Sequence, residues 1–500
     1  MKRLALVTLV LAAACGTTVP VTQQSLSSAG DGLTPSTTGS STGGATGDLT
    51  TTRGTGAGTS TGGGASSTTT GSSAGVGTSG ATGTTGTTGT SALPSTRPLA
   101  GGSRTPVEVG LLVVKDLGPA TEALGAKGLS TGDGPAQARA SVALLNARGG
   151  LAGHPIKPVV FEQDATRDAI SQYQAACSLF FDDHKVRAVV VWGIIPQVQA
   201  CSEKKGVPFV TSGNRSTSAA EISARRLTAV PSQVSLDRMV PAWIASLQAQ
   251  GYFAKASATE TVKIGLLFNE DKDYAGVPAL VKRELGRHGL TLGPQQSMPS
   301  TDDSSKAPAA SSAGSNAALK FASQGVNRVL TVDKSGQALA YFAIAAATQS
   351  YYPTYGISSL ELPNALRTVL SARQLQGAKG IGWLPAADRP ANGQPAQSAN
   401  STACLKAMTA AQQDMTSAVT RMSAFTICDS VLLLGAAWSD SALAPATFLS
   451  GLARLGTSYG SVMALADDFS RYRDGASVYR SLSYQSGCDC FQYSGAQTRF

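Results

Sequence analysis

The chain has 500 residues, of which 42% are hydrophobic and 14% are charged, and its formal net charge is +9 at pH 7. This length and composition fit a globular protein of two or three domains that is diluted by a polar segment. Lysine and arginine residues are scattered singly and are not interleaved with aromatic residues. This distribution indicates a solvated surface rather than a nucleic-acid-binding one, so we expect no nucleic acid as a partner.

The N-terminus reads MKRLALVTLVLAAACG, in which Lys2 and Arg3 precede an apolar run that ends at Ala14. The run is too short to cross a bilayer as a helix, and the pattern predicts a signal peptide over residues 1–15. The small residues before Cys15 resemble a bacterial lipobox, although Ala12 stands where leucine is usual. We therefore expect Cys15 to carry a lipid anchor, with plain secretion as the alternative. No later segment is expected to span a membrane.

Residues 16–105 are dominated by Gly, Ser, Thr and Ala, with stretches such as GATGTTGTTGT. A segment of this composition cannot bury enough apolar surface to offset its ordering entropy, which predicts a disordered linker. Its r.m.s. span is expected to be on the order of 50 Å. Such a linker would act as a tether between a membrane anchor and the folded part of the chain.

With Cys15 assigned to the lipid, six cysteines remain, and an even number in an exported chain suggests disulfides. Ile170, Tyr173, Cys177 and Phe180 recur at helical spacing on one face, and Cys201 does the same with Val198. The first predicted pair is therefore Cys177–Cys201, and the next is Cys404–Cys428. The CDC sequence at Cys488 and Cys490 closes on itself only with strain, or bonds externally, and it lacks the further ligands of a metal site.

From residue 106 the chain alternates short β-branched runs with longer amphipathic stretches. Near-continuous apolar runs indicate parallel strands that are covered on both faces, and the stretch at 135–148 has the apolar stripe of a helix. The first set of predicted strands covers residues 107–114, 156–162, 186–193 and 207–212.

The pattern restarts at residue 261 with another strand followed by a loop, TVKIGLLFNEDKDYAG. Its helices are predicted at 277–289 and 336–349, and its further strands at 327–333, 353–359 and 378–385. Two α/β units of this size in an exported chain favour a ligand site between them, because the strand ends of both units face one crevice.

Three segments resemble type I periplasmic binding proteins of the branched-chain amino acid (Leu/Ile/Val) class. They are ALLNARGGLAGHPIKPVVFEQDA, GVPFVTSGNRST and LLFNEDKDYAG, and their order and spacing match the family's together. The resemblance implies an α/β fold of two doubly wound parallel-sheet lobes joined by a three-strand hinge. It implies lobe 1 over residues 106–235 and 386–468, and lobe 2 over 236–385 and 469–500, with a closing strand pair within 459–484.

The glycines of the first segment are predicted to be a feature of the fold. Gly149 or Gly150 can take the left-handed conformation that ends a helix, and Gly153 permits a tight turn before the next strand. A phosphate-binding loop would instead place its glycines after a strand and before a helix. Asp164, at the end of that strand, is expected to cap the following helix.

Topology predicts the ligand contacts at the first positions after each strand. In lobe 1, backbone N–H groups and a serine hydroxyl there would suit a carboxylate or another anion. In lobe 2, Tyr274 is expected to close over the ligand from the opposite side. The predicted ligand-binding residues are Trp192, Gly193, Ser212, Gly213, Asn214, Asn269, Asp271, Tyr274, Asp333, Ser358 and Ser359, with Lys115, Asp116, Ile194 and Ser335 beside them.

Two loops depart from the amino-acid-binding pattern of that family. WGIIPQ has no hydroxyl where the family carries a Ser or Thr pair, and GISSLELP displaces the ammonium-binding acid to Glu361. Both departures favour a less polar or aromatic ligand over an amino acid. The predicted function is therefore that of an extracytoplasmic solute-binding lipoprotein, a monomer without cofactor or metal. It would capture a small organic molecule by hinge closure and deliver it to the permease of an ABC transporter.

Two alternatives remain at this point. A ligand sensor or surface receptor of the same fold would give the same sequence pattern. A secreted hydrolase is less favoured, because the G-x-S-x-G matches that begin at residues 39, 58 and 71 lie in the tether, where none follows a strand. The histidines His154, His184 and His288 also lack catalytic or metal-binding spacing, so an enzyme is not expected.

Overall fold

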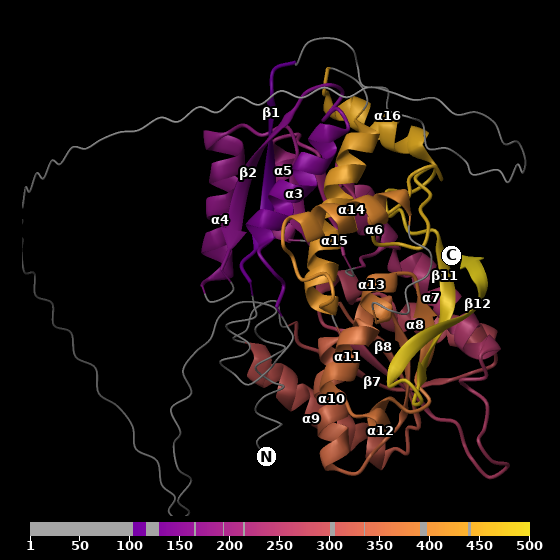
Figure 1. The fold of residues 1–500 in the computed structure, drawn as a ribbon. Helices are drawn as coiled ribbons and strands as arrows, with labels where there is room; N and C mark the ends of the chain where they lie inside the picture. The colour runs from indigo at the N-terminus through magenta and orange to yellow at the C-terminus, as the bar shows by residue number, and fades with distance from the viewer. Residues whose placement is uncertain are drawn as a thin grey trace, which may run out of the picture. The chain divides into compact units, whose positions relative to one another are not determined.

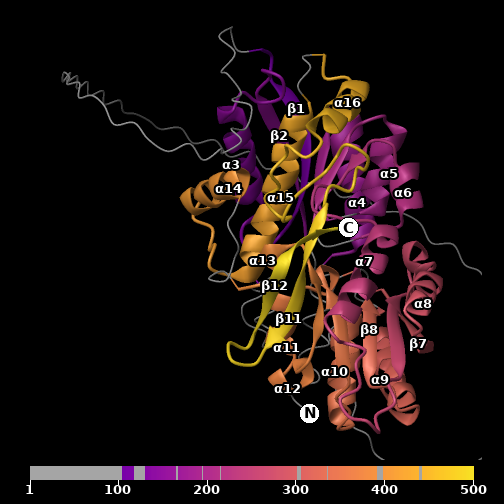
Figure 2. The same ribbon diagram turned by 90° about the vertical axis from the view of Figure 1, so that its right-hand side faces the viewer.

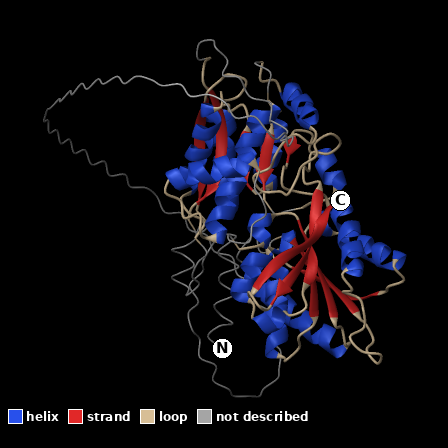
Figure 3. Cartoon of the chain, turned by 45° about the vertical axis from the view of Figure 1, so that its right-hand side comes forward, coloured by secondary structure: helices blue, strands red, loops and turns tan. Residues whose placement is uncertain are grey.

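The computed structural model describes residues 104–116, 130–164, 167–193, 195–213, 216–300, 306–334, 336–390, 398–438 and 442–500. The predicted signal peptide, Cys15 and nearly all of the predicted tether lie outside the described residues, as do Asn214, Ile194 and Ser335. The described chain contains two sheets, each with helices on both faces, as the cartoon in Figure 3 shows.

The first sheet is wholly parallel and has the strand order β2-β1-β3-β4-β5. Residues of β1 alternate between two apolar cores: Leu111 packs with helices from one face of the sheet, and Leu112 packs with Phe180 on the other. This double burial explains the near-continuous apolar runs of these strands. The strands are β1 (Val107–Val114), β2 (Ile156–Gln163), β3 (Val189–Trp192), β4 (Phe209–Ser212) and β5 (Thr228–Ala229).

The second sheet has the order β12-β11-β10-β9-β8-β6-β7, and it is parallel only from β10 to β7. β11 pairs antiparallel with β10, and β12 pairs antiparallel with β11. This antiparallel hairpin forms the edge of the otherwise parallel second sheet, because a hairpin can extend a sheet without a crossover helix. The strands are β6 (Ile264–Asn269), β7 (Leu292–Met298), β8 (Arg328–Val332), β9 (Thr354–Ser358), β10 (Lys379–Gly382), β11 (Val478–Gln485) and β12 (Cys490–Arg499).

Helices that are far apart in the sequence cover the first sheet together. One face of it is covered by α3, which follows β1, and by α15, which comes from the C-terminal part of the chain, and Figure 1 shows the two side by side. The helices contributed to this lobe are α3 (Gly134–Ala147), α4 (Ala169–Ser178), α5 (Pro196–Lys204), α6 (Ala219–Ala224), α14 (Ala399–Ala410), α15 (Ala418–Ala437) and α16 (Pro445–Leu455).

The second sheet is covered by α7 and α8 on one side and by α9 and α10 on the other. Figure 2 shows these helices around the sheet, together with the β11–β12 hairpin at its edge. The helices around this sheet are α7 (Leu236–Ala249), α8 (Val277–Arg287), α9 (Ala307–Ser323), α10 (Gln337–Thr348), α11 (Pro363–Val369), α12 (Ala372–Leu375) and α13 (Pro385–Asp388).

By length and composition α15 is apolar enough to cross a membrane, contrary to the expectation that no later segment would be. Most of its side chains are buried against the first sheet and its neighbouring helices. A core helix of a large α/β unit meets the same criterion because it is apolar all round. The packing assigns α15 to the protein core.

Three connections join the two sheets, and they are hydrogen-bonded to one another. The indole N–H of Trp383, on the second connection, donates to the carbonyl of Ser232 on the first, at 3.0 Å. The amide of Leu465, on the third, donates to the carbonyl of Trp383, at 3.0 Å. Val230 and Asp474 form a parallel bridge between the first and third connections. These contacts form the three-strand hinge of the predicted fold.

The turn between α3 and β2 has the predicted geometry. Gly149, Gly150 and Gly153 all have positive φ, at 104°, 67° and 90°. A Cβ on Gly150 would lie 2.1 Å from the carbonyl oxygen of His154, so no larger residue fits there. The cap of the next helix is Asp168, which accepts from the amide of Ser171, and not Asp164 as expected. Asp164 instead lies 3.2 Å from the ammonium of Lys115.

The structure pairs Cys177 with Cys201 and Cys404 with Cys428, the two pairs predicted from the sequence. Their Cα atoms are 6.1 and 6.3 Å apart, which is within the range for disulfides. Cys488 and Cys490 form the third bond, so the CDC sequence closes on itself at the β11–β12 turn. One detail of the helical-face argument was wrong, because the side chain of Ile170 is exposed.

Removing the Cys177–Cys201 bond is expected to lower the free energy of unfolding by ~3 kcal/mol, because the 24-residue separation releases a long loop in the unfolded chain. The double variant C177S/C201S, unfolded in urea, tests this. The matched control C488S/C490S opens a loop of only two residues' separation and should lose clearly less. Equal losses from the two variants would contradict the loop-entropy account.

Candidate functional site

The predicted first-lobe residues follow adjacent strands. Trp192 ends β3 beside Ser212, which ends β4, and the two are register partners. Gly193 and Gly213 follow them with φ of 84° and 136°, and a Cβ on either would meet no atom within 4 Å. Both glycines therefore turn the chain at the carboxyl edge of the sheet, where space remains beside the backbone.

Ser212 is fully buried and hydrogen-bonds within the first lobe. Its hydroxyl lies 2.7 Å from that of Ser232 and 2.9 Å from the carboxylate of Asp429 on α15. Asp429 also accepts from the hydroxyls of Tyr459 and Ser461 and from a backbone amide. Burial raises the pKa of the Asp429 carboxyl, while these donors oppose that shift. Ser212 thus belongs to a network that ties α15 to β4 and to the hinge.

In the second lobe, the predicted polar residues bond to one another. The Asp333 carboxylate accepts from the amides of Lys334 and Ala338 and from the side chain of Asn269, and so it caps the start of α10. Burial raises the pKa of the Asp333 carboxyl, and these donors oppose the rise. Asp271 forms an ion pair with Lys334.

Ser358 and Ser359 are also buried, and their hydroxyls donate hydrogen bonds within the protein. Ser358 donates to Glu361 at 2.8 Å, within a capping box at the end of β9. Ser359 donates to Asp388 at 2.8 Å. Burial raises the pKa of the Glu361 carboxyl to about 8 and that of Asp388 to about 7. Glu361 thus turns back onto its own loop, and Asp388 is hydrogen-bonded beside the second connection.

Tyr274 links the lobes directly. It lies in the loop after β6, is 2% exposed, and donates its hydroxyl to the carbonyl of Ser216 at 2.9 Å. Ser216 lies in the loop after β4 of the first lobe. The predicted role of Tyr274, which is to close over the ligand from the second lobe, stays a prediction.

Several buried polar atoms at the same edge of the first sheet have no hydrogen-bond partner among the described residues. They belong to the indole N–H of Trp192, the hydroxyls of Ser216 and Thr217, and both polar atoms of the Gln233 amide. These residues follow β3, β4 and β5, which are neighbours in the sheet. An unpaired buried polar atom costs about 1–3 kcal/mol, which makes these atoms candidates for hydrogen bonds with a bound molecule.

Of these residues only Trp192 was predicted. Ser216 and Thr217 lie within the quoted GVPFVTSGNRST segment, two and three positions beyond the predicted Asn214. The signal for these two residues in the sequence was that both side chains carry a hydroxyl group. Gln233 belongs to the first hinge connection and carried no signal in the sequence, because the hinge positions follow from tertiary structure alone.

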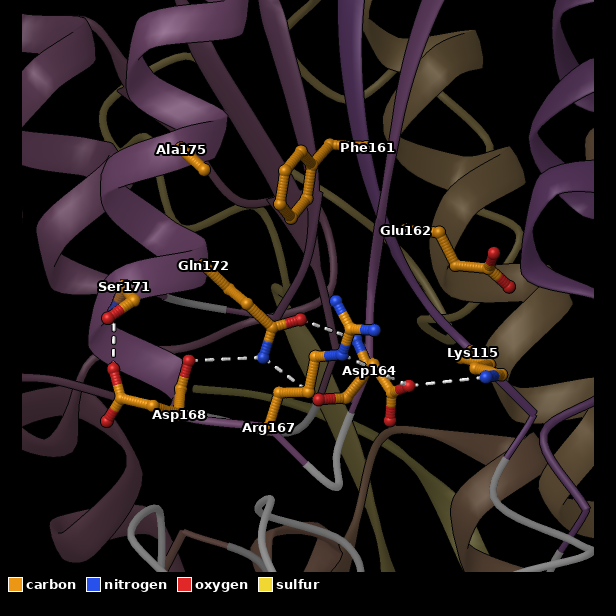
Figure 4. Close-up of a pocket in the computed structure, with 9 residues that line it drawn as sticks. All are labelled: Lys115, Phe161, Glu162, Asp164, Arg167, Asp168, Ser171, Gln172 and Ala175. Atoms are coloured by element: carbon orange, nitrogen blue, oxygen red, sulfur yellow. Dashed lines mark hydrogen bonds and ion pairs between the residues drawn. The ribbon is translucent and has the colours of Figure 1, made fainter. Parts of the chain in front are cut away.

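Two surface hollows lie elsewhere. The larger, of about 700 Å³, is drawn in Figure 4 between α4 and the end of β2. Lys115 and Arg167 both pair with Asp164 there and Asp168 caps α4, so these four charged side chains already have partners. The second, of about 370 Å³, is lined by Arg226, Arg471 and Arg473 among others. Neither hollow includes a residue of the second sheet.

Structural comparison finds solved proteins with the same arrangement. A substrate-binding protein of an ABC transporter from Aeropyrum pernix has a TM-score of 0.58 at 13% identity, covering 79% of this chain and 96% of its own. The solute-binding protein of an ABC transporter from R. palustris, in complex with 4-hydroxybenzoate, has a TM-score of 0.56 at 12% identity, with coverages of 79% and 97%.

A third structure, from Desulfitobacterium hafniense, is an ABC transporter substrate-binding protein in complex with Leu. Its TM-score is 0.51 at 15% identity, covering 78% of this chain and 100% of its own. The fold is that of the type I periplasmic binding proteins. No family model and no curated protein sequence matches the chain.

In this binding-protein fold, the described residues contain no cluster of three or more His, Cys, Asp or Glu side chains that could hold a metal ion. The histidines make separate contacts: His154 with the carbonyl of Thr105, and His184 with Glu108. The solved neighbours are binding proteins and not enzymes.

The raised pKa of Glu361 predicts a pH dependence of stability. The folded protein holds this proton up to about pH 8, whereas the unfolded chain releases it near its ordinary value of 4.5. Because the folded state binds more protons between these values, stability falls as pH rises through that window, by up to ~1.4 kcal/mol per pH unit. E361Q should flatten the fall, measured as melting temperature from pH 5 to 9.

D388N provides a second, independent test, because burial raises the pKa of Asp388 in the same direction within a separate cluster. Each variant alone should flatten the profile in part, and the two together should flatten it further. A profile of E361Q as steep as that of the unsubstituted protein would show that Glu361 ionises freely in the folded state.

Proposed function

We propose that this protein is an extracytoplasmic solute-binding protein that captures a small organic molecule between its two lobes by hinge closure. The observation that carries the proposal is the group of unpartnered buried polar atoms on Trp192, Ser216, Thr217 and Gln233. They gather at the carboxyl edge of one sheet and beside the hinge, where ligands of open α/β folds bind. A ligand with polar groups would satisfy them.

The proposed contacts come from both sides of the crevice. Trp192, Gly193 and Gly213 would contribute from the first lobe together with Asn214, and Tyr274 from the second. Ser212, Asn269, Asp333, Ser358 and Ser359 would shape the site from beneath, because their side chains are buried and hydrogen-bonded inside their own lobes. The proposed lobe boundaries are residues 106–235 with 386–468, and 236–385 with 469–500.

The ligand is proposed to be less polar than an amino acid. The acids of the second lobe are occupied: Asp333 caps α10, Glu361 bonds within its loop, and Asp271 pairs with Lys334. A free ammonium group would then lack a carboxylate partner, which disfavours burying it. An aromatic or aliphatic compound fits better beside the Trp192 ring.

The last part of the proposal concerns delivery of the bound solute to a transporter. The lobes in their closed form would dock on the permease of an ABC transporter, since the solved neighbours serve such transporters. A lipid on Cys15 and a tether over residues 16–105 would hold the binding unit at the outer side of the cell membrane as a monomer. Mass spectrometry of the intact N-terminal peptide tests the lipid.

The four tryptophans provide an internal test of where ligand binds. Trp243, Trp383 and Trp438 are fully buried and their indole N–H groups have partners, whereas Trp192 is partly exposed and its N–H has none. Ligand binding should therefore change the fluorescence of Trp192 above all. The molecule released from natively purified protein, identified by mass spectrometry, is the titrant.

W192F should remove most of the ligand-induced fluorescence change, and the matched control W438F should retain it. W192F should also weaken binding several-fold in calorimetry, because the indole contact is lost. A full fluorescence response in W192F would place the ligand elsewhere. If natively purified protein releases no small molecule and none of a broad panel of organic acids, amides and amino acids binds, the proposed function is wrong.

A further inference from the structure

Arg421 is a buried arginine in the first turn of α15, with 4% of its surface exposed. A buried guanidinium normally has a carboxylate or several carbonyls as partners, because leaving its charge uncompensated is costly. Arg328, the other arginine buried to this degree among the described residues, shows the rule. It donates to the carbonyls of Tyr252 and Ala254 and pairs with Glu260.

Arg421 has no such compensation. Its Nε and Nη2 atoms are buried and without a hydrogen-bond partner in the described part of the chain. Burial lowers the pKa of the Arg421 guanidinium, and no neighbouring carboxylate acts to raise it. Since an arginine keeps its proton even so, the side chain remains a cation with unused donors.

The position of Arg421 is at the edge where the lobes meet. The hydroxyl of its neighbour Thr420 donates to the carbonyl of Ser130 at 2.8 Å, and Ser130 donates to Asp116, two residues beyond the end of β1. The opposite end of α15 packs on α16 through Trp438 and Phe448. The contacts of α15 with α11 and α13, which flank the second sheet, are therefore made by its first half, as Figure 2 also indicates.

We propose that Arg421 binds the carboxylate of the ligand held between the lobes, which makes the substrate class a small organic acid without an ammonium group. A planar guanidinium offers paired N–H donors that match the two oxygens of a carboxylate. The first turn of a 20-residue helix adds favourable backbone polarity for an anion. This inference rests on the proposed function, and it adds the charge that the ligand must carry.

Binding of an organic acid would account for the incomplete pairing of charges in this region. Glu361 and Asp271 are bonded within the second lobe, whereas the buried guanidinium of Arg421 in the first lobe has donors without a partner. A ligand with one negative charge balances that cation. An amino acid zwitterion would bring a positive charge that finds no partner.

The test uses benzoate, phenylacetate and hexanoate, each compared by calorimetry with its own primary amide, on the full chain. At least one acid should bind, and its amide should bind about 100-fold more weakly, as expected when one partner of a buried charge pair is lost. R421Q should lose about the same factor for the acid and little for the amide. R139Q, which removes an exposed charge from neighbouring α3, should bind as the unsubstituted protein does.

A second readout separates ligand binding from a structural role. If Arg421 awaits a ligand, R421M should raise the melting temperature of the ligand-free protein, by roughly 2 °C, since it removes an uncompensated buried charge. If Arg421 supports the fold, R421M should lower it. A lowered melting temperature in R421M, or acid binding by R421Q equal to that of the unsubstituted protein, overturns the inference.

The remaining outcomes distinguish this inference from the proposed function. Binding of a neutral or cationic molecule that changes Trp192 fluorescence would overturn the role of Arg421 and leave solute capture between the lobes intact. Binding of no acid, no amide and no molecule released from the purified protein would contradict both.

Discussion

The buried carboxylate of Asp429 is the contact on which the arrangement of the first lobe depends. It accepts hydrogen bonds from Ser212 at the end of β4, from Tyr459 and from Ser461, and it lies on α15, 217 residues after Ser212 in the chain. Ser212 passes this network on to Ser232 in the first hinge connection. One ionisable group thus holds together segments that the sequence keeps far apart.

The three connections of the hinge are also held together by buried polar contacts. Its first and second connections meet at the Trp383 indole, and its first and third meet through Asp474, which pairs with Arg238 and accepts from the amide of Ser235. Because each connection is bonded to another, the lobes can move by bending of the three together but not by independent drift. This is the mechanical requirement for closure around a solute.

In the second lobe, most of the predicted polar side chains at the strand ends bond to one another, although the hydroxyl of Thr331 on β8 has no partner among the described residues. In the first lobe and the hinge, polar atoms of Trp192, Ser216, Thr217 and Gln233 remain unpaired, and Arg421 lies at the same edge. We therefore propose that the first lobe makes most of the polar contacts with the ligand.

Much of this fold could be predicted because parallel strands leave continuous apolar runs and the α3 turn requires its glycines. β7 escaped prediction because LGPQQSM is a half-exposed edge strand rich in glutamine, and β12 because CFQYSGAQTR is largely polar. The site was harder. Topology located the strand ends, but whether the hydroxyl of Ser212 or of Ser216 is left without a partner depends on the local turn, and the burial of Arg421 follows only from the packing of a distant helix.

The most direct test of capture between the lobes is hydrogen exchange of the full chain, followed by mass spectrometry, with its co-purified ligand and after the ligand is removed by unfolding and refolding. The account predicts that removal speeds exchange in both lobes at once, around residues 192–193, 213–217 and 269–274, and in the hinge at 231–235. A change confined to one lobe, or to the outer hollow beside α4, would contradict it.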